Sequence, residues 1–315
     1  MNEVRREKLE KQKVARIFAA ILAAVALLSA CRGGGVNPDT VLPQQQLRQV
    51  TDDLGRTVPI PQKIRRAVSL APNLTEIIFA VGAGDRLVGV TTFCNYPEEA
   101  RAIAKVGDTM TPNMETIVAL KPDVVFVSTA SQIETFMKTL EANGIKVYVT
   151  NPNSLDGVFA NLRQFGELFG TQAIADKLIA DQEKRVSLVW DRVGDQKPVR
   201  VFVQISKEPL FTIGKQSFLT AILEKAGSVS VTKDVETAYP KISKETASAL
   251  TPEAIILSDS EDNKEPNEVF KNSPISKNGR IYKVDADLLS RPGPRLVDAL
   301  EQIAKDLHPD TFRNK

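Results

Sequence analysis

The fold is decided by a stretch of sequence that occurs twice. Residues Asn113–Ser128 read NMETIVALKPDVVFVS, and residues Ser243–Ser258 read SKETASALTPEAIILS. Each copy predicts a short helix, which ends before a proline that cannot continue it, and then an apolar run typical of a buried parallel strand. The copies begin about 130 positions apart, whereas a solenoid repeats every roughly 20–50 residues. We therefore expect two α/β lobes of similar design.

An acidic residue occupies the same position in both copies. Glu115 and Glu245 each lie in the first turn of the predicted helix. Acidic residues at this position also complement the helix dipole, so a purely structural role stays open for either residue alone. Their matched placement, one in each lobe, favours a shared function.

The longest helical pattern in the chain lies between the two copies. Apolar residues recur at helical spacing from Leu155 to Phe169, Gly170 interrupts the pattern, and a second run spans about 171–193. A helix of some 22 residues is roughly 33 Å long, about the width of one lobe. We therefore predict an α/β protein whose two α/β lobes are joined by a single long α-helix, with a ligand cleft between the lobes.

The N-terminal residues predict export. Basic residues from Arg5 to Arg16 precede the apolar run Ile17–Leu28, which is too short to span a bilayer permanently. The residues before Cys31 resemble a bacterial lipobox, which implies cleavage there and lipidation of the thiol. An uncleaved N-terminal anchor is the alternative. Acylation would hold the exported chain at the cell membrane, facing the periplasm or the exterior.

The chain therefore divides into five predicted segments. They are a lipoprotein signal peptide (1–30), a flexible tether (31–46), an N-terminal α/β lobe (47–153), a helical linker (154–194) and a C-terminal α/β lobe (195–315).

Composition and motifs exclude several function classes. Without the signal peptide the formal charge falls from +2 to about −1, so no basic surface indicates nucleic acid. The single histidine, His308, follows the last predicted helix, where a structural role is expected, and it leaves no base for a catalytic triad. No zinc-binding motif occurs. We expect no enzyme, no cofactor and no bound metal.

Several side chains follow predicted strands, where open α/β sheets bind ligands. The candidate ligand-binding residues are Asn73, Phe93, Tyr96, Ser128, Phe211, Tyr239, Asp287 and Arg291. Arg291 is the most telling of them, because the neighbouring prolines stiffen the loop predicted at 287–291. For each aromatic residue alone, ordinary packing explains its presence equally well. Cys94 fits a small buried filler or a side chain that faces the cleft.

Long stretches of the chain resemble a known family. The segments IRRAVSLAPNLTEIIFAVGAGDRLVGVTTFCNYPEEA, EPLFTIGKQSFL, YPKISKE and RPGPRLVDAL are similar to those of substrate-binding lipoproteins that serve ABC importers for vitamin B12 and iron chelates. The resemblance covers nearly everything from Leu47 to Pro309. It implies two α/β lobes joined by a helix and delivery of a small ligand to a membrane permease.

The resemblance also implies roles for individual residues. Glu115 and Glu245 match the acids that dock against the permease. Phe93, Tyr239, Asp287 and Arg291 match ligand-contacting positions of the cobalamin branch. Thr109 and Ser128 stand where a cobalamin binder has tryptophans, which keeps a ferric siderophore or haem as the alternative ligand. We expect a monomer that captures a cobalamin or related corrinoid; an exported enzyme on this fold is a less favoured hypothesis.

Overall fold

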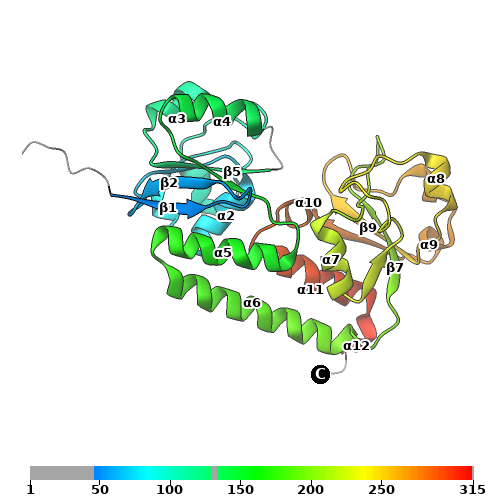
Figure 1. Cartoon of the computed structure of the whole chain (residues 1–315). Coiled ribbons are helices and arrows are strands. Elements are labelled where there is room, and N and C mark those ends of the chain that lie inside the picture. Colours follow the sequence, from blue (N-terminus) through cyan, green and yellow to red (C-terminus); the bar gives the residue numbers. More distant parts are fainter. Residues whose placement is uncertain (1–45, 130–132, 314–315) are drawn as a thin grey trace, which may run out of the picture. The chain divides into compact units, whose positions relative to one another are not determined.

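The computed structural model describes residues 46–129 and 133–313, and the chain from Gln46 onward forms one compact unit. The predicted signal peptide (1–30), Cys31 and all but the last residue of the predicted tether lie outside the described residues. Within the compact unit, two four-stranded sheets carry helices on their faces (Figure 1). The predicted fold class, two α/β lobes, is confirmed.

The first lobe is built on a parallel sheet with strand order β4-β3-β5-β6. Its strands are β3 (Ala67–Ser69), β4 (Leu87–Val90), β5 (Val124–Ser128) and β6 (Val147–Thr150). Its helical elements are α2 (Pro72–Ala80), η2 (Gly84–Arg86), η3 (Glu98–Ala102), α3 (Met114–Ala119) and α4 (Ile133–Ala142). A hairpin precedes them: β1 (Leu47–Thr51) and β2 (Thr57–Pro61) pair antiparallel.

The second lobe repeats this topology. Its parallel sheet has the order β10-β9-β7-β8, and in each lobe the first strand lies between the second and the third. The strands are β7 (Val199–Gln204), β8 (Ser228–Ser230), β9 (Ala254–Asp259) and β10 (Ile281–Asp285). The helical elements are α7 (Phe218–Lys225), α8 (Lys244–Ala249), η4 (Glu268–Phe270), α9 (Pro274–Lys277), α10 (Ala286–Ser290), α11 (Leu296–Leu307) and α12 (Pro309–Arg313).

The two sequence copies occupy equivalent places in the two lobes. Each forms a six-residue helix, α3 or α8, followed by an inner strand, β5 or β9. The strands are buried on both faces, because alternate side chains enter different cores. Val125 and Ile255 contribute to separate outer clusters, whereas Phe126 and Ile256 contribute to one cluster that extends through both lobes.

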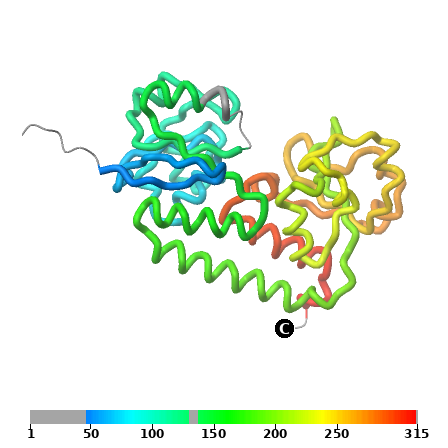
Figure 2. Tube along the Cα trace, in the orientation of Figure 1, coloured from blue at the N-terminus to red at the C-terminus, as the bar shows by residue number. Residues whose placement is uncertain are grey.

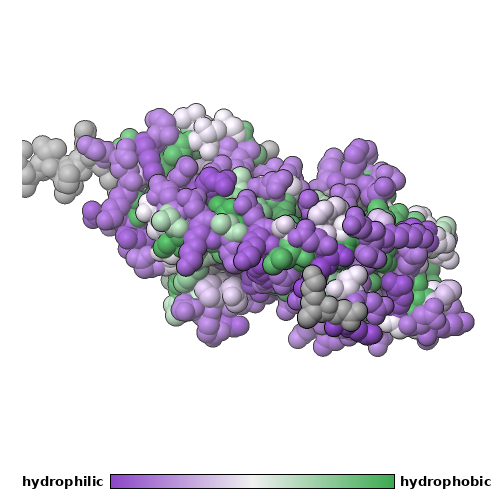
Figure 3. Space-filling model, turned by 90° about the horizontal axis from the view of Figure 1, so that it is seen from below, coloured by the Kyte–Doolittle hydropathy of each residue, from purple (hydrophilic) through white to green (hydrophobic). Residues whose placement is uncertain are grey.

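That shared cluster holds the lobes together. It includes Phe126 of β5, Phe165 of the helix that follows the first lobe, and Leu300 of α11 in the second lobe. The trace of α11 runs beside that of α6 (Gln172–Val193) (Figure 2). Seen from the α6 side, the surface is largely hydrophilic, with scattered apolar side chains (Figure 3). A continuous core limits how far one lobe can move against the other, because opening them would expose apolar surface.

The helical segment between the lobes is a pair of packed helices. α5 (Leu155–Phe169) ends at Gly170, which adopts φ 72° as the left-handed residue that commonly closes a helix. The 22-residue helix α6 then passes from the first lobe toward α12 in the second (Figure 1). Arg185 ties it to α11 through Asp298 at 2.6 Å and Glu301 at 2.9 Å.

One predicted loop is a helix. Residues 286–290 form α10, for which the Asp285 carboxylate provides the N-cap by accepting from the backbone N–H of Asp287 at 2.7 Å. The prediction of a loop over 287–291 was therefore wrong for most of its length. Five residues are too few to show helical periodicity in a sequence.

Candidate functional site

A cavity of about 410 Å³ lies between the two lobes. Residues from both lobes line it: Ser128, Thr129, Asn151, Pro152 and Asn153 from the first, and Ile205, Gln216, Phe218, Tyr239, Ser258, Leu289, Ser290 and Pro292 from the second. A second cavity of about 350 Å³ shares Ser128, Ser290 and Pro292 with it. The shared residues make the two cavities neighbouring parts of one cleft, which we call the interlobe cleft.

The position of the cleft follows from the sheet topology. In each lobe the first and third strands are neighbours. From the first strand the chain continues toward one edge of the sheet, and from the third strand it continues toward the opposite edge. Such switch points leave a crevice beyond the carboxyl ends of the strands. Ser128 at the end of β5, Ile205 directly after β7 and Ser258 in β9 all line the cleft. Both sheets therefore direct their switch points to the same site.

The larger cavity has a neutral lining. Among the described residues that line it, the side chains carry amides, hydroxyls or apolar groups, and none is charged. Tyr239 is 42% exposed; partial desolvation raises its pKa, and a hydrogen bond with Ser217 opposes this more weakly. The tyrosine therefore remains a neutral phenol at physiological pH. This arrangement suits a bulky ligand whose polar groups are uncharged.

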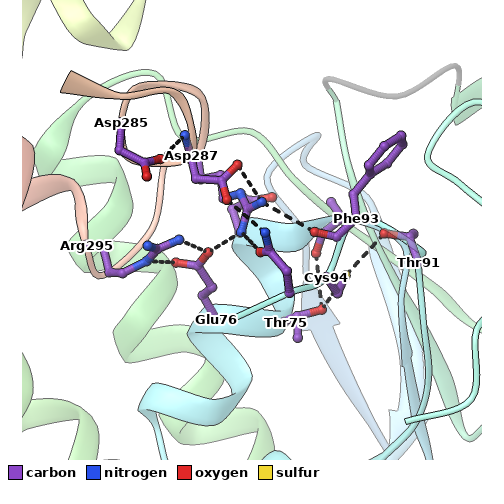
Figure 4. A network of polar contacts seen from close by, with 12 residues as sticks. Thr75, Glu76, Thr91, Phe93, Cys94, Asp285, Asp287 and Arg295 are labelled. Atoms are coloured by element: carbon purple, nitrogen blue, oxygen red, sulfur yellow. Dashed lines mark hydrogen bonds and ion pairs between the residues drawn. The ribbon is translucent and has the colours of Figure 1, made fainter. Parts of the chain in front are cut away.

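Six of the eight predicted ligand-binding residues line the interlobe cleft. Asn73, Phe93, Asp287 and Arg291 line the smaller cavity of the cleft, together with Thr109. Phe93 is 55% exposed, and its ring points away from the polar network beneath it (Figure 4). Ser128 lines both cavities and Tyr239 the larger one.

Two other predicted residues lie elsewhere. Tyr96 lines a separate cavity of about 370 Å³ with Gln182 and Arg185, and its ring is covered by the guanidinium of Arg295 at 4.1 Å. Phe211 is half-buried, and its backbone bridges to that of Lys241. Neither side chain lines either cavity of the interlobe cleft.

Several cleft residues escaped the sequence interpretation. Asn151 and Asn153 directly follow β6, so the rule that residues after strands bind ligands could have found them. Gln216 and Phe218 lie at the start of α7, where no such rule applies. Only the packing of α7 against the rest of the lobe brings them to the cleft.

A buried polar network joins the lobes at one end of the cleft (Figure 4). Glu76 of α2, with a side chain only 1% exposed, accepts from Arg291 Nη1 at 2.8 Å and from Arg295 Nε and Nη2 at 2.9 and 2.6 Å. Arg291 also pairs with Asp287 at 2.6 Å. The hydrogen bonds with Glu76 raise the pKa of Arg295, and burial lowers this pKa by a smaller amount. Arg291 is thus held by carboxylates of both lobes.

The paired acids of the sequence repeat are exposed and equivalent. Glu115 and Glu245 are each the second residue of a helix whose N-cap side chain, Asn113 or Ser243, accepts from the backbone of the residue three positions on. Hydrogen bonds, chiefly from its own backbone and then from Ser243, lower the pKa of Glu245. Figure 1 shows α3 and α8 on the side of the lobes away from α6.

Cys94 and His308, two further chemically reactive side chains, contact neighbouring protein groups. Cys94 is buried between the hydroxyls of Thr75 and Thr91, at 3.1 and 3.2 Å from its sulfur. His308 Nε2 lies 2.8 Å from the carbonyl oxygen of Gly227. Within residues 46–129 and 133–313, no group of three metal-ligating side chains occurs. The same residues contain no helix long and apolar enough to cross a membrane.

Comparison with known proteins defines the class. Residues 68–288 match the periplasmic binding protein family, and the chain belongs to it. Over 314 residues it is 32% identical to the uncharacterised ABC transporter substrate-binding lipoprotein YvrC of Bacillus subtilis strain 168, covering 96% of this chain and 99% of that protein.

Two further relatives carry a named ligand. The chain is 30% identical over 251 residues to the vitamin B12-binding protein of Vibrio vulnificus, covering 77% of this chain and 89% of that protein. The crystal structure of the periplasmic vitamin B12 binding protein BtuF of Vibrio cholerae superimposes with a TM-score of 0.68 at 26% identity, over 81% of this chain and all of BtuF. These similarities agree with the sequence resemblance and with the two-lobed fold.

Proposed function

We propose that this protein is the extracytoplasmic substrate-binding protein of an ABC importer, and that it captures cobalamin or a related corrinoid in the interlobe cleft. The neutral lining of the larger cavity carries this proposal. A corrinoid presents a large flat ring system edged with amides, which matches amide, hydroxyl and apolar partners. Haem carries carboxylates, and many ferric siderophores carry net negative charge, so both would favour cationic partners.

Further observations support this proposal. The adjoining cavities of about 410 and 350 Å³ fall within the roughly 300–1,000 Å³ range of ligand sites. Relatives named for vitamin B12 match most of the chain. The protein acts as a monomer tethered through lipidated Cys31, and Glu115 and Glu245 dock against the permease, which fits their exposed, equivalent places in the lobes.

Calorimetric titration tests the ligand. We expect wild-type protein to bind cyanocobalamin, and Tyr239→Ala to weaken binding by about 1.5–3 kcal/mol, the value of fully burying a large side chain, or roughly 10- to 150-fold. The matched control is Trp190→Ala, which removes an aromatic side chain of similar exposure, 46% against 42%, from α6. If cyanocobalamin gives no heat and haem or a ferric siderophore binds tightly, the cleft is a site for an iron chelate and the corrinoid proposal is wrong.

Lipidation is tested separately. Wild-type protein expressed in a bacterial host should incorporate labelled palmitate, and Cys31→Ser should abolish incorporation. Equal labelling of both would refute the anchor at Cys31 without bearing on the ligand.

A further inference from the structure

The interlobe cleft contains one cationic side chain among the described residues that line its two cavities. That side chain is Arg291, in the smaller cavity. An arginine in a ligand site ordinarily recognises carboxylates or other anions, because its guanidinium presents donors in a rigid fork. Whether the cleft attracts anions therefore depends on whether these donors are available.

Both Nη atoms of Arg291 are engaged by protein groups, through three hydrogen bonds and one ion pair. Nη1 donates to Glu76 Oε1 at 2.8 Å and to Asn95 Oδ1 at 2.7 Å. Nη2 pairs with Asp287 Oδ1 at 2.6 Å and donates to the Phe93 carbonyl oxygen at 3.4 Å. An anion that approaches either Nη atom would therefore compete with acceptors that are already in place.

The charges within the network also balance. Glu76 and Asp287 supply two carboxylates, and Arg291 and Arg295 supply two guanidinium groups. Asn95 Nδ2 donates to Asp287 Oδ2 at 3.0 Å, which holds this carboxylate across the lobe junction (Figure 4). The Arg291 side chain is only 8% exposed. The end of the cleft that contains the arginine thus presents little net positive charge to a ligand.

We propose that Glu76 and Asp287 set the charge specificity of the cleft by occupying Arg291, so that the site selects bulky uncharged ligands against anionic iron chelates. This inference rests on the proposed function only in taking the interlobe cleft as the ligand site. It assigns to two acidic residues a specificity role that requires no direct contact between Glu76 and the ligand. Removing either negative charge should make the cleft more attractive to anions.

Asp287→Asn gives the sharpest test, because asparagine keeps an acceptor for Asn95 but loses the charge that pairs with Arg291. Asp285→Asn is the matched control: it removes the same charge two residues away, Asp285 is exposed, and asparagine caps a helix as well as aspartate does. Binding of cyanocobalamin and of a ferric tris-catecholate complex is measured for each protein by equilibrium dialysis with visible absorbance. Glu76→Gln provides a second variant, with its folding checked by circular dichroism.

We expect Asp287→Asn to raise the affinity for the ferric tris-catecholate at least tenfold and to lose part of this gain at high salt. Asp285→Asn should change neither affinity. The inference is overturned if folded Asp287→Asn and Glu76→Gln bind the anion within twofold of wild type. Failure of wild type to bind cyanocobalamin would refute the proposed ligand instead, and the comparison of the two aspartate variants toward the anion would still decide whether Arg291 is occupied.

Discussion

Replacing Glu76 by alanine should destabilise the whole compact unit, because it removes one partner from a buried ion-pair network. The carboxylate accepts from Arg291 and Arg295 at 2.6–2.9 Å, and these side chains are only 8% and 20% exposed. Breaking a buried pair by deleting one partner costs about 3–5 kcal/mol, since the charge left behind is poorly solvated. At about 2–4 °C per kcal/mol for a domain of this size class, the melting temperature should fall by about 10 °C.

Urea unfolding followed by circular dichroism measures this loss. Because one core extends through both lobes, we expect a single transition. Glu98→Ala is the control: Glu98 pairs with Arg101 at 2.9 Å, but the two side chains are 84% and 59% exposed, so its loss should cost less than about 1 kcal/mol. If Glu76→Ala unfolds at the same urea concentration as Glu98→Ala, the network does not stabilise the lobe junction and the reasoning is wrong.

Two further predictions concern the exposed residues Glu115 and Glu245 and the buried Tyr148 of the first lobe. The double variant Glu115→Ala/Glu245→Ala should lower uptake by cells severalfold while leaving ligand affinity unchanged. The control double variant Asp181→Ala/Glu183→Ala on α6 should change neither uptake nor affinity. Equal loss of uptake and affinity in the Glu115/Glu245 variant would contradict the docking role. Burial, and then the charges of Asp53 and Asp52, raise the pKa of Tyr148, so folded protein holds this proton while unfolded protein releases it above about pH 10. The free energy of unfolding should therefore fall as pH rises above 10, and Tyr148→Phe should reduce that slope in urea titrations at pH 8 and 11; identical slopes would show that Tyr148 does not contribute.

Much of the fold was predictable because its signals are local. The Leu-x-Pro junctions of the two copies, Leu120 to Pro122 and Leu250 to Pro252, mark where a helix must stop, and the apolar runs after them are long enough to identify buried strands. Gly170 likewise marks the end of α5, since a left-handed residue there closes the helix.

The cleft was predictable only in part. Ser128 could be placed there because it ends a strand of a parallel sheet, and ligands bind beyond such ends. Phe211 lies in the segment after β7, which ends at Gln204, yet its backbone pairs with that of Lys241 and its side chain does not line the cleft. Position after a strand fixes which edge of the sheet a residue occupies, but the course of the following loop decides where its side chain lies.

The amino-acid sequence by itself determined the two matched lobes, the helical segment between them and the acidic residue at the start of each repeated helix, because all of these follow from short-range periodicity and from repetition. Only the tertiary structure decided the electrostatic character of the cleft. Glu76 and Arg291 are 215 positions apart in the chain, and no local pattern reveals that the arginine donates to a buried carboxylate of the other lobe. Charge pairing depends on distance in space, which becomes defined only when both lobes have packed around their common core.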